Sequence, residues 1–127
     1  MEKIPATDQP VLGLNLNRIE FEIRLGPDVH SLGGAFAFQE DLEYVNLQVT
    51  SNITDLSFMF CGSHSFNQPV GNWDTSNVTD MSGMFMNAEA FNQPIGDWDT
   101  SKVSNMRFMF SRAKSFNQPV DGWNISM

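Results

Sequence analysis

The sequence predicts a repeat solenoid, a fold in which short units of similar sequence stack on one another. Three observations predict it. The motif Phe-Asn-Gln-Pro begins at Phe66, Phe91 and Phe116, so it recurs every 25 residues. Tryptophan recurs at the same interval, at positions 73, 98 and 123. Residues 67–91 and 92–116 are identical at 14 of 25 positions, which is far above chance.

We expect two regions, an N-terminal β cap over residues 1–25 and a solenoid of about four rungs over residues 26–127. The clear 25-residue units lie at 67–91 and 92–116, and the period becomes irregular towards the N-terminus. The cap includes residues 19–25, where apolar and polar side chains alternate as in a half-buried strand. One unit of this size cannot bury its apolar side alone, so the units must pack against one another.

Each unit is expected to combine a short parallel strand with a short helical turn. Pro69 has no N–H group for a ladder, so the strand starts after it and covers residues 70–73. Residues 81–85 follow the pair Thr79-Asp80, which is typical of a helix N-cap, and are predicted to form one turn of α or 3-10 helix. Equivalent elements are expected in the other units.

Stacked units place equivalent side chains above one another, about 4.8 Å apart where strands pair. Phe66, Phe91 and Phe116 are therefore expected to form one internal column. The asparagine and the glutamine that follow each of these phenylalanines never vary, and we expect their amides to form hydrogen-bonded ladders between units. A row of ligand-binding amides is the alternative.

The composition suits one small acidic domain. The chain has 127 residues, is 41% apolar, and carries 15 acidic against 7 basic residues, so its net charge is −8. Such a charge excludes general binding to the phosphate backbone of nucleic acids. No apolar run is long enough to span a bilayer, so we expect no membrane insertion.

The sequence contains no pattern typical of an enzyme or a cofactor site, and we predict a non-enzymatic protein without cofactor or metal. Cys61 and His64 have the spacing of half a zinc site, but no second ligand pair follows. Cys61 is the only cysteine, which excludes an internal disulfide. The two histidines, His30 and His64, have no supporting pattern of a catalytic triad around them.

Residues 73–85, Trp-Asp-Thr-Ser-Asn-Val-Thr-Asp-Met-Ser-Gly-Met-Phe, followed by the next Phe-Asn-Gln-Pro motif and Trp98, closely resemble one repeat family. It is the BspA-like leucine-rich-repeat surface-protein family, the DUF285 group of mycoplasmas and other bacteria. The resemblance is specific over residues 50–127 and degenerate over 19–49. It implies a leucine-rich-repeat-like solenoid displayed on bacterial surfaces and used in adhesion or host contact.

Positions at which the units differ are the candidates for contact with a partner, because repeat proteins place binding diversity on their outward positions. In the unit 92–116, basic residues replace neutral or acidic residues of the preceding unit. The candidates are Asn77, Ser82, Asn87, Lys102, Arg107, Arg112 and Lys114. Solvated surface variation is the alternative interpretation.

The row of tryptophans, Trp73, Trp98 and Trp123, has two interpretations. The favoured one places the row in the core, because a repeat keeps a residue unchanged where it must interlock with its own copies. The alternative is an exposed aromatic stripe that binds a protein or a glycan.

We predict a module for protein–protein or cell-surface recognition and adhesion, whose partner is another protein or a host or cell-surface ligand. The alternative is a small acidic cytoplasmic inhibitor or immunity-type protein that masks a basic target. The chain is expected at the cell surface or secreted if it is a fragment of a longer protein, and in the cytoplasm if it is complete, since it shows no signal peptide. An end-to-end homodimer through residues 116–127 is also predicted, because solenoids need terminal caps.

Overall fold

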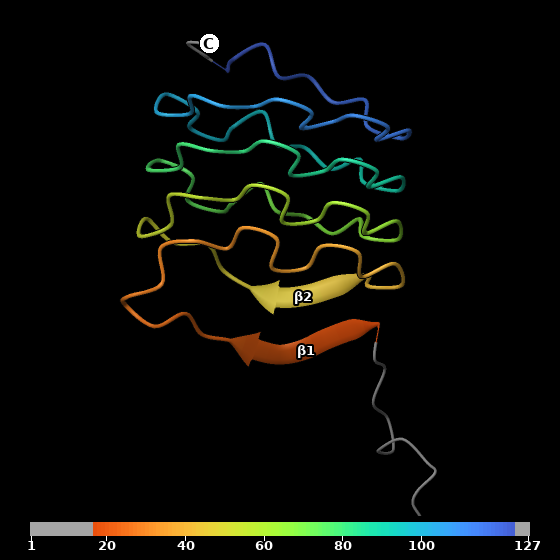
Figure 1. Cartoon of the computed structure of the whole chain (residues 1–127), viewed down its shortest axis with the longest axis horizontal. Coiled ribbons are helices and arrows are strands. Elements are labelled where there is room, and N and C mark those ends of the chain that lie inside the picture. The colour runs from red at the N-terminus through yellow and green to blue at the C-terminus, as the bar shows by residue number, and fades with distance from the viewer. Residues whose placement is uncertain (1–16, 124–127) are drawn as a thin grey trace, which may run out of the picture.

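The computed structural model of the chain describes residues 17–123. The predicted fold class, a leucine-rich-repeat-like solenoid of short parallel strands and short α or 3-10 turns in about four rungs, is wrong. The described residues contain no helix, and their only strands are β1 (Arg18–Ile23) and β2 (Tyr44–Leu47), which form one small sheet. Turns, bends, isolated bridges and irregular backbone make up the remainder of residues 17–123 (Figure 1).

The two strands are parallel and lie side by side at one end of the molecule (Figure 1). β1 falls largely within residues 19–25, the alternating stretch that predicts a half-buried strand. Its Ile19 and Ile23 pack against the core, as that alternation requires. The pairing register shifts between these two residues, and Phe21, which lies in this irregular part, is 70% exposed.

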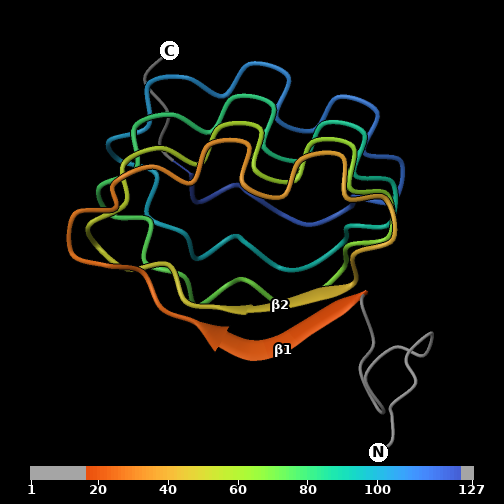
Figure 2. The same cartoon turned by 60° about the horizontal axis from the view of Figure 1, so that its bottom comes forward.

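Four equivalent stretches, which we call the first to fourth turn segments, lie on the side of the molecule opposite the sheet (Figure 2). They are residues 31–38, 55–62, 80–87 and 105–112. Isolated parallel bridges join them at equivalent positions, from Ser31 to Asp55, from Asp55 to Asp80 and from Asp80 to Asn105. Residues 24 or 25 positions apart in the sequence are therefore neighbours in space.

Consecutive tight turns stand where helical turns were predicted, because the backbone N–H groups alternate between two kinds of acceptor. In the second turn segment, Phe58 donates to the carbonyl of Ser82 in the next segment at 2.8 Å, whereas Met59 donates back to Leu56 at 3.3 Å. In an α-helix, every N–H group would donate to the carbonyl four residues earlier in the same segment. Phe58 also has a φ of 56°, in the left-handed region, which a right-handed helix excludes.

The residues predicted to cap helices cap these turns instead. The Asp80 carboxylate accepts hydrogen bonds from the N–H and from the hydroxyl of Ser82, at 2.9 and 2.6 Å. Asn105 accepts the N–H of Arg107 in the same way, at 3.0 Å. An Asp or Asn side chain that binds the backbone two residues later is a turn signal as well as a helix-cap signal, so the sequence pattern is compatible with both structures.

The strands predicted after each Phe-Asn-Gln-Pro motif are also absent. Pro69 has no N–H group, and the side-chain amide of Gln68 makes the hydrogen bonds to β2 instead. Its oxygen accepts the N–H of Val45 at 2.7 Å, and its nitrogen donates to the carbonyl of Val45 at 3.1 Å. The Gln68 side chain therefore makes the hydrogen bonds that a neighbouring strand would otherwise make to β2, and residues 69–72 do not join a ladder.

Amide ladders connect the units, as the invariant asparagines and glutamines predict. Asn67 Oδ1 accepts the N–H of Asn92 at 2.9 Å, and Gln93 Nε2 donates to the carbonyl of Asn67 at 3.0 Å. Asn92 makes the same contacts with Asn117 and Gln118 of the following unit. These side chains are satisfied within the protein, which supports their structural interpretation over a ligand-binding row.

Two aromatic columns fill the core between the sheet side and the turn segments. Phe66, Phe91 and Phe116 stack with ring centroids 6.2 and 6.0 Å apart, as predicted for an internal column. The second column stacks at 5.8 to 6.0 Å and consists of Phe36, Phe60, Phe85 and Phe110. The columns contact each other, with 3.9 Å between the ring centroids of Phe85 and Phe91. Burial of these rings is a large favourable contribution to folding.

The substitution Phe85→Ala is expected to destabilise the protein by about 3–5 kcal/mol, because it opens a cavity where the two columns meet. Phe85 is fully buried and stacks on Phe60, Phe91, Trp98 and Phe110. Urea unfolding followed by tryptophan fluorescence measures the change.

The matched control is Phe21→Ala, which removes a largely exposed ring of the same size. A loss below about 1 kcal/mol is expected for it. Equal losses in the two variants would contradict the placement of Phe85 in the core.

Candidate functional site

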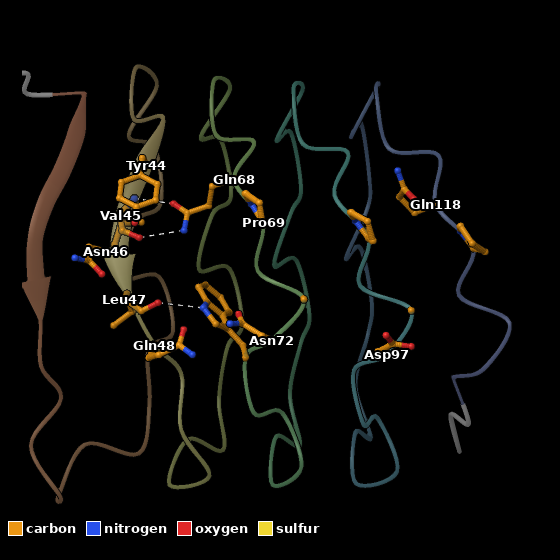
Figure 3. Close-up of a pocket in the computed structure, with 15 residues that line it drawn as sticks. Tyr44, Val45, Asn46, Leu47, Gln48, Gln68, Pro69, Asn72, Asp97 and Gln118 are labelled. Carbon is orange, nitrogen blue, oxygen red and sulfur yellow. Dashed lines mark hydrogen bonds between the residues drawn. The ribbon is translucent and has the colours of Figure 1, made fainter.

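A groove runs along the sheet side of the molecule, across β2 and the proline-containing segments that follow it (Figure 3). Its volume is about 980 Å³. Equivalent residues of successive units line it, among them Pro69, Pro94 and Pro119. Asp97 is the one charged residue in the lining, so the groove is close to neutral on a strongly acidic protein.

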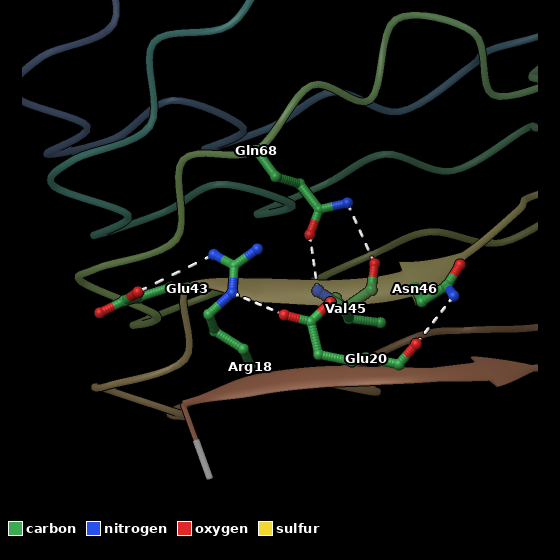
Figure 4. A network of polar contacts seen from close by, with 6 residues as sticks. All are labelled: Arg18, Glu20, Glu43, Val45, Asn46 and Gln68. Carbon is green, nitrogen blue, oxygen red and sulfur yellow. Dashed lines mark hydrogen bonds and ion pairs between the residues drawn. The ribbon is translucent and has the colours of Figure 1, made fainter. Parts of the chain in front are cut away.

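At β2 a network of polar contacts borders the groove (Figure 4). The Arg18 guanidinium binds Glu20 at 2.9 Å and lies 4.0 Å from Glu43 and 4.7 Å from the ring centroid of Tyr44. The hydrogen bond to Glu20 raises the pKa of Arg18. Asn46 Nδ2 donates to the carbonyl of Glu20 at 2.9 Å. These contacts position Tyr44 and Asn46, which both line the groove.

The tryptophan row belongs to the core. Trp73 and Trp98 are each 4% exposed, Trp123 is half-buried, and neighbouring rings stack 6.4 to 6.5 Å apart. Each indole N–H donates to a backbone carbonyl of an earlier unit at 3.0 to 3.1 Å, and the acceptors are Leu47, Val70 and Ile95. The row is therefore not an exposed stripe, although Trp73 contributes to the groove lining.

Between the prolines and the tryptophans, the groove exposes backbone groups that no described residue uses. Within residues 17–123, the N–H groups of Gly71, Asn72, Gly96 and Asp97 donate no hydrogen bond, and their carbonyl oxygens accept none. Unused donors and acceptors therefore belong to lining residues of two successive units. Unpaired backbone groups of this kind can bind a ligand, as they do at the edge of a sheet.

Three of the residues predicted to face a partner, Asn77, Lys102 and Lys114, are bound to their neighbours along the stack. Asn77 Nδ2 donates to the carbonyl of Ser51 at 2.8 Å, and Lys102 Nζ donates to Asn77 Oδ1 at 2.7 Å. Glu89, in turn, lies 3.6 Å from Lys114 Nζ. These side chains reach solvent, but each also connects two units.

The other predicted contact residues lie in the third and fourth turn segments. Ser82 is 8% exposed and bound to Asp80, so the structure does not place it on the outside. Asn87 and Arg112 each have a φ of 60°, at the ends of their segments. Arg107 lies 5.5 Å from the ring centroid of Phe108. None of these predicted residues lines the groove.

Asp74 and Asp99, which directly follow Trp73 and Trp98, have lowered pKa values. The hydroxyl and N–H of Ser76 bind Asp74, and those of Ser101 bind Asp99, which lowers the pKa of both carboxyls. For Asp55, burial acts to raise the pKa, but hydrogen bonds from Ser57 and Ser31 outweigh it and the net pKa is lowered.

The cysteine singled out in the sequence is a core residue. Cys61 is a free, buried thiol, and this burial raises its pKa. In the described part of the chain, no three side chains of His, Cys, Asp or Glu come together as a metal site. That part also holds no helix of the length and apolar character needed to cross a bilayer.

The segment predicted to mediate an end-to-end dimer is described only in part, since residues 124–127 lie outside the described range. Within it, Phe116, Val120 and Trp123 are partly buried against the core. The dimer itself stays a prediction.

Residues 30–127 match the model of a family described as mycoplasma protein of unknown function, DUF285. The chain belongs to the DUF285 family. The resemblance carried by the tryptophan and Phe-Asn-Gln-Pro motifs is thereby confirmed. No curated protein and no solved structure matches the chain.

The groove of this DUF285 chain was not predicted from the sequence. Pro69 was interpreted as the start of a strand, whereas it begins a segment without ladder hydrogen bonds. A signal was nevertheless present, because a glycine follows each of Pro69 and Pro94 by two residues, as Gly71 and Gly96. A proline and a glycine so close together disfavour a regular strand and mark exposed backbone.

Gly71→Ala is expected to destabilise this DUF285 chain by about 1–3 kcal/mol. The added methyl group would lie 2.9 Å from the carbonyl oxygen of Pro94, so the backbones of two units would have to separate. Gly26→Ala is the control, because no atom lies within 4 Å of its added methyl group. Thermal unfolding compares the two, and an equal effect would argue against close approach of the units at Gly71.

Acid is expected to lower the stability of the protein through Asp55, Asp74 and Asp99. A carboxyl whose folded pKa is lowered contributes stability above its unfolded pKa of about 3.9, and that contribution is lost as the pH falls through the folded pKa. The free energy of unfolding should therefore decrease from about pH 5 downward. In NMR titrations, Ser101→Ala should raise the pKa of Asp99 and leave that of Asp74 unchanged. An unchanged pKa of Asp99 would contradict the role of this hydrogen bond.

Proposed function

We propose that this DUF285 chain is a non-enzymatic recognition module that binds a polypeptide segment in the groove along its sheet side. The supporting observation is the set of unused backbone N–H and carbonyl groups at Gly71, Asn72, Gly96 and Asp97. A polypeptide carries both kinds of group, and it can pair with them as a peptide does when it extends a sheet edge.

The side chains of the groove favour an uncharged partner segment. Asn46, Gln48 and Asn72 have amides that can donate and accept hydrogen bonds, and the proline rings offer apolar contact. Asp97 is the only charge in the lining. We therefore expect the affinity to come from hydrogen bonds and apolar contact, with little dependence on salt.

The net charge of −8 favours a second candidate function, an acidic inhibitor that masks a basic protein. Electrostatic attraction of this kind weakens steeply with ionic strength, whereas binding in the neutral groove should not. The salt dependence of partner binding therefore separates the two functions. Display on the cell surface follows from the family resemblance and is part of the same proposal.

Selection of a random library of displayed peptides on the immobilised chain tests the groove. Enriched uncharged peptides are expected to bind at least about tenfold more weakly to Asn72→Arg, which fills the groove with a long cation. Asn52→Arg makes the same change at an exposed residue outside the groove and should bind as the parent does.

Peptides that bind both variants equally would place the interaction elsewhere and overturn the groove proposal. Enrichment of basic peptides alone, with binding abolished at high salt, would favour the inhibitor instead.

A further inference from the structure

The groove on the sheet side crosses several passes of the chain, which we call levels. Its lining residues come from four successive levels, within residues 44–48, 68–73, 94–97 and 118–119. These levels lie side by side, so the groove runs along the direction in which they stack (Figure 3). A bound chain that contacts all of them must therefore cross the levels, whereas a chain laid along one level would contact only part of the lining.

The unused backbone groups of the groove recur at equivalent positions of two interior levels. Gly71 and Asn72 lie in one level, and their equivalents 25 residues later are Gly96 and Asp97. A methyl group added to Gly71 would lie 2.9 Å from the carbonyl oxygen of Pro94, and one added to Gly96 would be as close to the equivalent oxygen one level further on. Each of the two levels is therefore already in contact with the level that follows it. Within residues 17–123, its backbone groups at these positions nevertheless remain unused.

The tryptophans that directly follow Asn72 and Asp97 give the distance between levels beside the groove. The rings of Trp73 and Trp98 are nearly parallel, with 6° between their planes, and their centroids are 6.5 Å apart. Trp98 and Trp123 have 5° between their planes and centroids 6.4 Å apart. Because the rings are nearly parallel copies of one another, these separations give the displacement from one level to the next.

An extended polypeptide has the same repeat along its own axis. A β-strand rises by about 3.2–3.4 Å per residue, so two residues span about 6.4–6.8 Å. The displacement of 6.4 to 6.5 Å between levels falls in this range. Successive residues of a strand direct their N–H and carbonyl groups to opposite sides. Every second residue of a strand that crosses the levels would therefore direct both groups to the groove, and the residues between would direct theirs to solvent.

Other regular conformations of a bound chain do not match the distance between levels. A polyproline II helix has three residues per turn and rises by about 3.1 Å per residue, so its equivalent groups recur about every 9.3 Å. An α-helix has a pitch of about 5.4 Å and uses its backbone N–H groups for its own hydrogen bonds. Neither conformation presents a free backbone donor and acceptor at each level.

We infer, on the basis of the proposed function, that the groove binds its polypeptide as an extended strand that runs across the levels, with two residues of the strand for each level. One residue pairs with the free groups of Gly71 and Asn72, and the second residue after it pairs with those of Gly96 and Asp97. We call these the facing residues of the bound strand. They cannot be proline, which has no N–H group.

The same arrangement sets the length and the composition of the bound strand. Contact with all four levels takes about seven residues, since three steps of two residues connect four levels. Uncharged residues with a preference for extended backbone, such as valine, isoleucine and threonine, are favoured. The ligand class is therefore a short, uncharged, strand-forming segment of a polypeptide.

Backbone N-methylation of bound peptides tests the two-residue repeat. The probes are uncharged peptides that are enriched on the immobilised full chain and lose binding to Asn72→Arg, synthesised with each N–H group methylated in turn. Methylation of a facing residue removes its hydrogen bond to the groove and should weaken binding at least about tenfold. Methylation of the residue between two facing residues should weaken it less than about twofold, because that N–H group points to solvent. Fluorescence anisotropy measures the affinities, and loss and tolerance should alternate along the peptide.

A matched pair of insertions tests the spacing independently. One threonine inserted between the two facing residues turns every later residue to the opposite side and should weaken binding at least about tenfold. Two inserted threonines return the later residues to the groove one level further on, and should recover most of the affinity.

Amide hydrogen exchange shows the direction of the bound peptide. The N–H groups of Asn72 and Asp97 should exchange rapidly in the free protein and become protected together in a one-to-one complex, because one strand crosses both levels. The N–H groups of Phe60 and Phe85, which donate within the stack, should be protected in both states.

Three results would each overturn the arrangement: protection of Asn72 without Asp97, an N-methyl scan without alternation, and equal binding of the two insertion peptides. In each of these cases the peptides would still lose binding to Asn72→Arg, so the groove would remain a peptide site and the proposed function would stand. Failure to enrich any peptide that depends on Asn72 would instead overturn the proposed function, and the extended arrangement with it.

Discussion

Alternation of the backbone N–H groups between two acceptors is the constraint on which this structure depends. In the turn segments, every second N–H donates to the next segment, and the residues between them close tight turns within their own segment. The pattern excludes a helix, which would direct all donors along one axis. The bridges between the segments join positions 24 or 25 residues apart in the sequence, which is the length of one unit. Left-handed residues such as Phe58 and Gly83 follow from the alternation, because the backbone must reverse direction within each segment.

Much of the packing could be predicted from the sequence, because it depends on which residues recur. The phenylalanine column and the amide ladders of Asn67 and Asn92 lie where the period places them. The local conformation could not be predicted in the same way. Asp80 followed by Ser82 is compatible with a helix cap and with a turn, and Pro69 is compatible with a strand start and with unpaired backbone. Those ambiguities led to the wrong fold class.

For the candidate site, too, some features could be predicted from the sequence and others could not. The interpretation of variable positions as outward positions fails for Ser82, which varies between units yet is buried against Asp80. The basic residues were found because charge can be counted in the sequence, but their position in and beside the fourth turn segment required the structure. The groove depends on backbone groups of Gly71 and Asn72, and the availability of a backbone group is not encoded by any single side chain. Two chemically distinct surfaces result, one nearly neutral and one basic, on an acidic DUF285 chain.

Detection of hydrogen-bond scalar couplings by NMR tests the central claim most directly, since such a coupling links the donor nitrogen to the carbonyl carbon of its acceptor. The structure predicts couplings from the nitrogen of Phe60 to the carbonyl of Met84, and from that of Phe85 to the carbonyl of Met109. Couplings from Phe85 to the carbonyl of Met81, the pattern of a helix, would contradict the account.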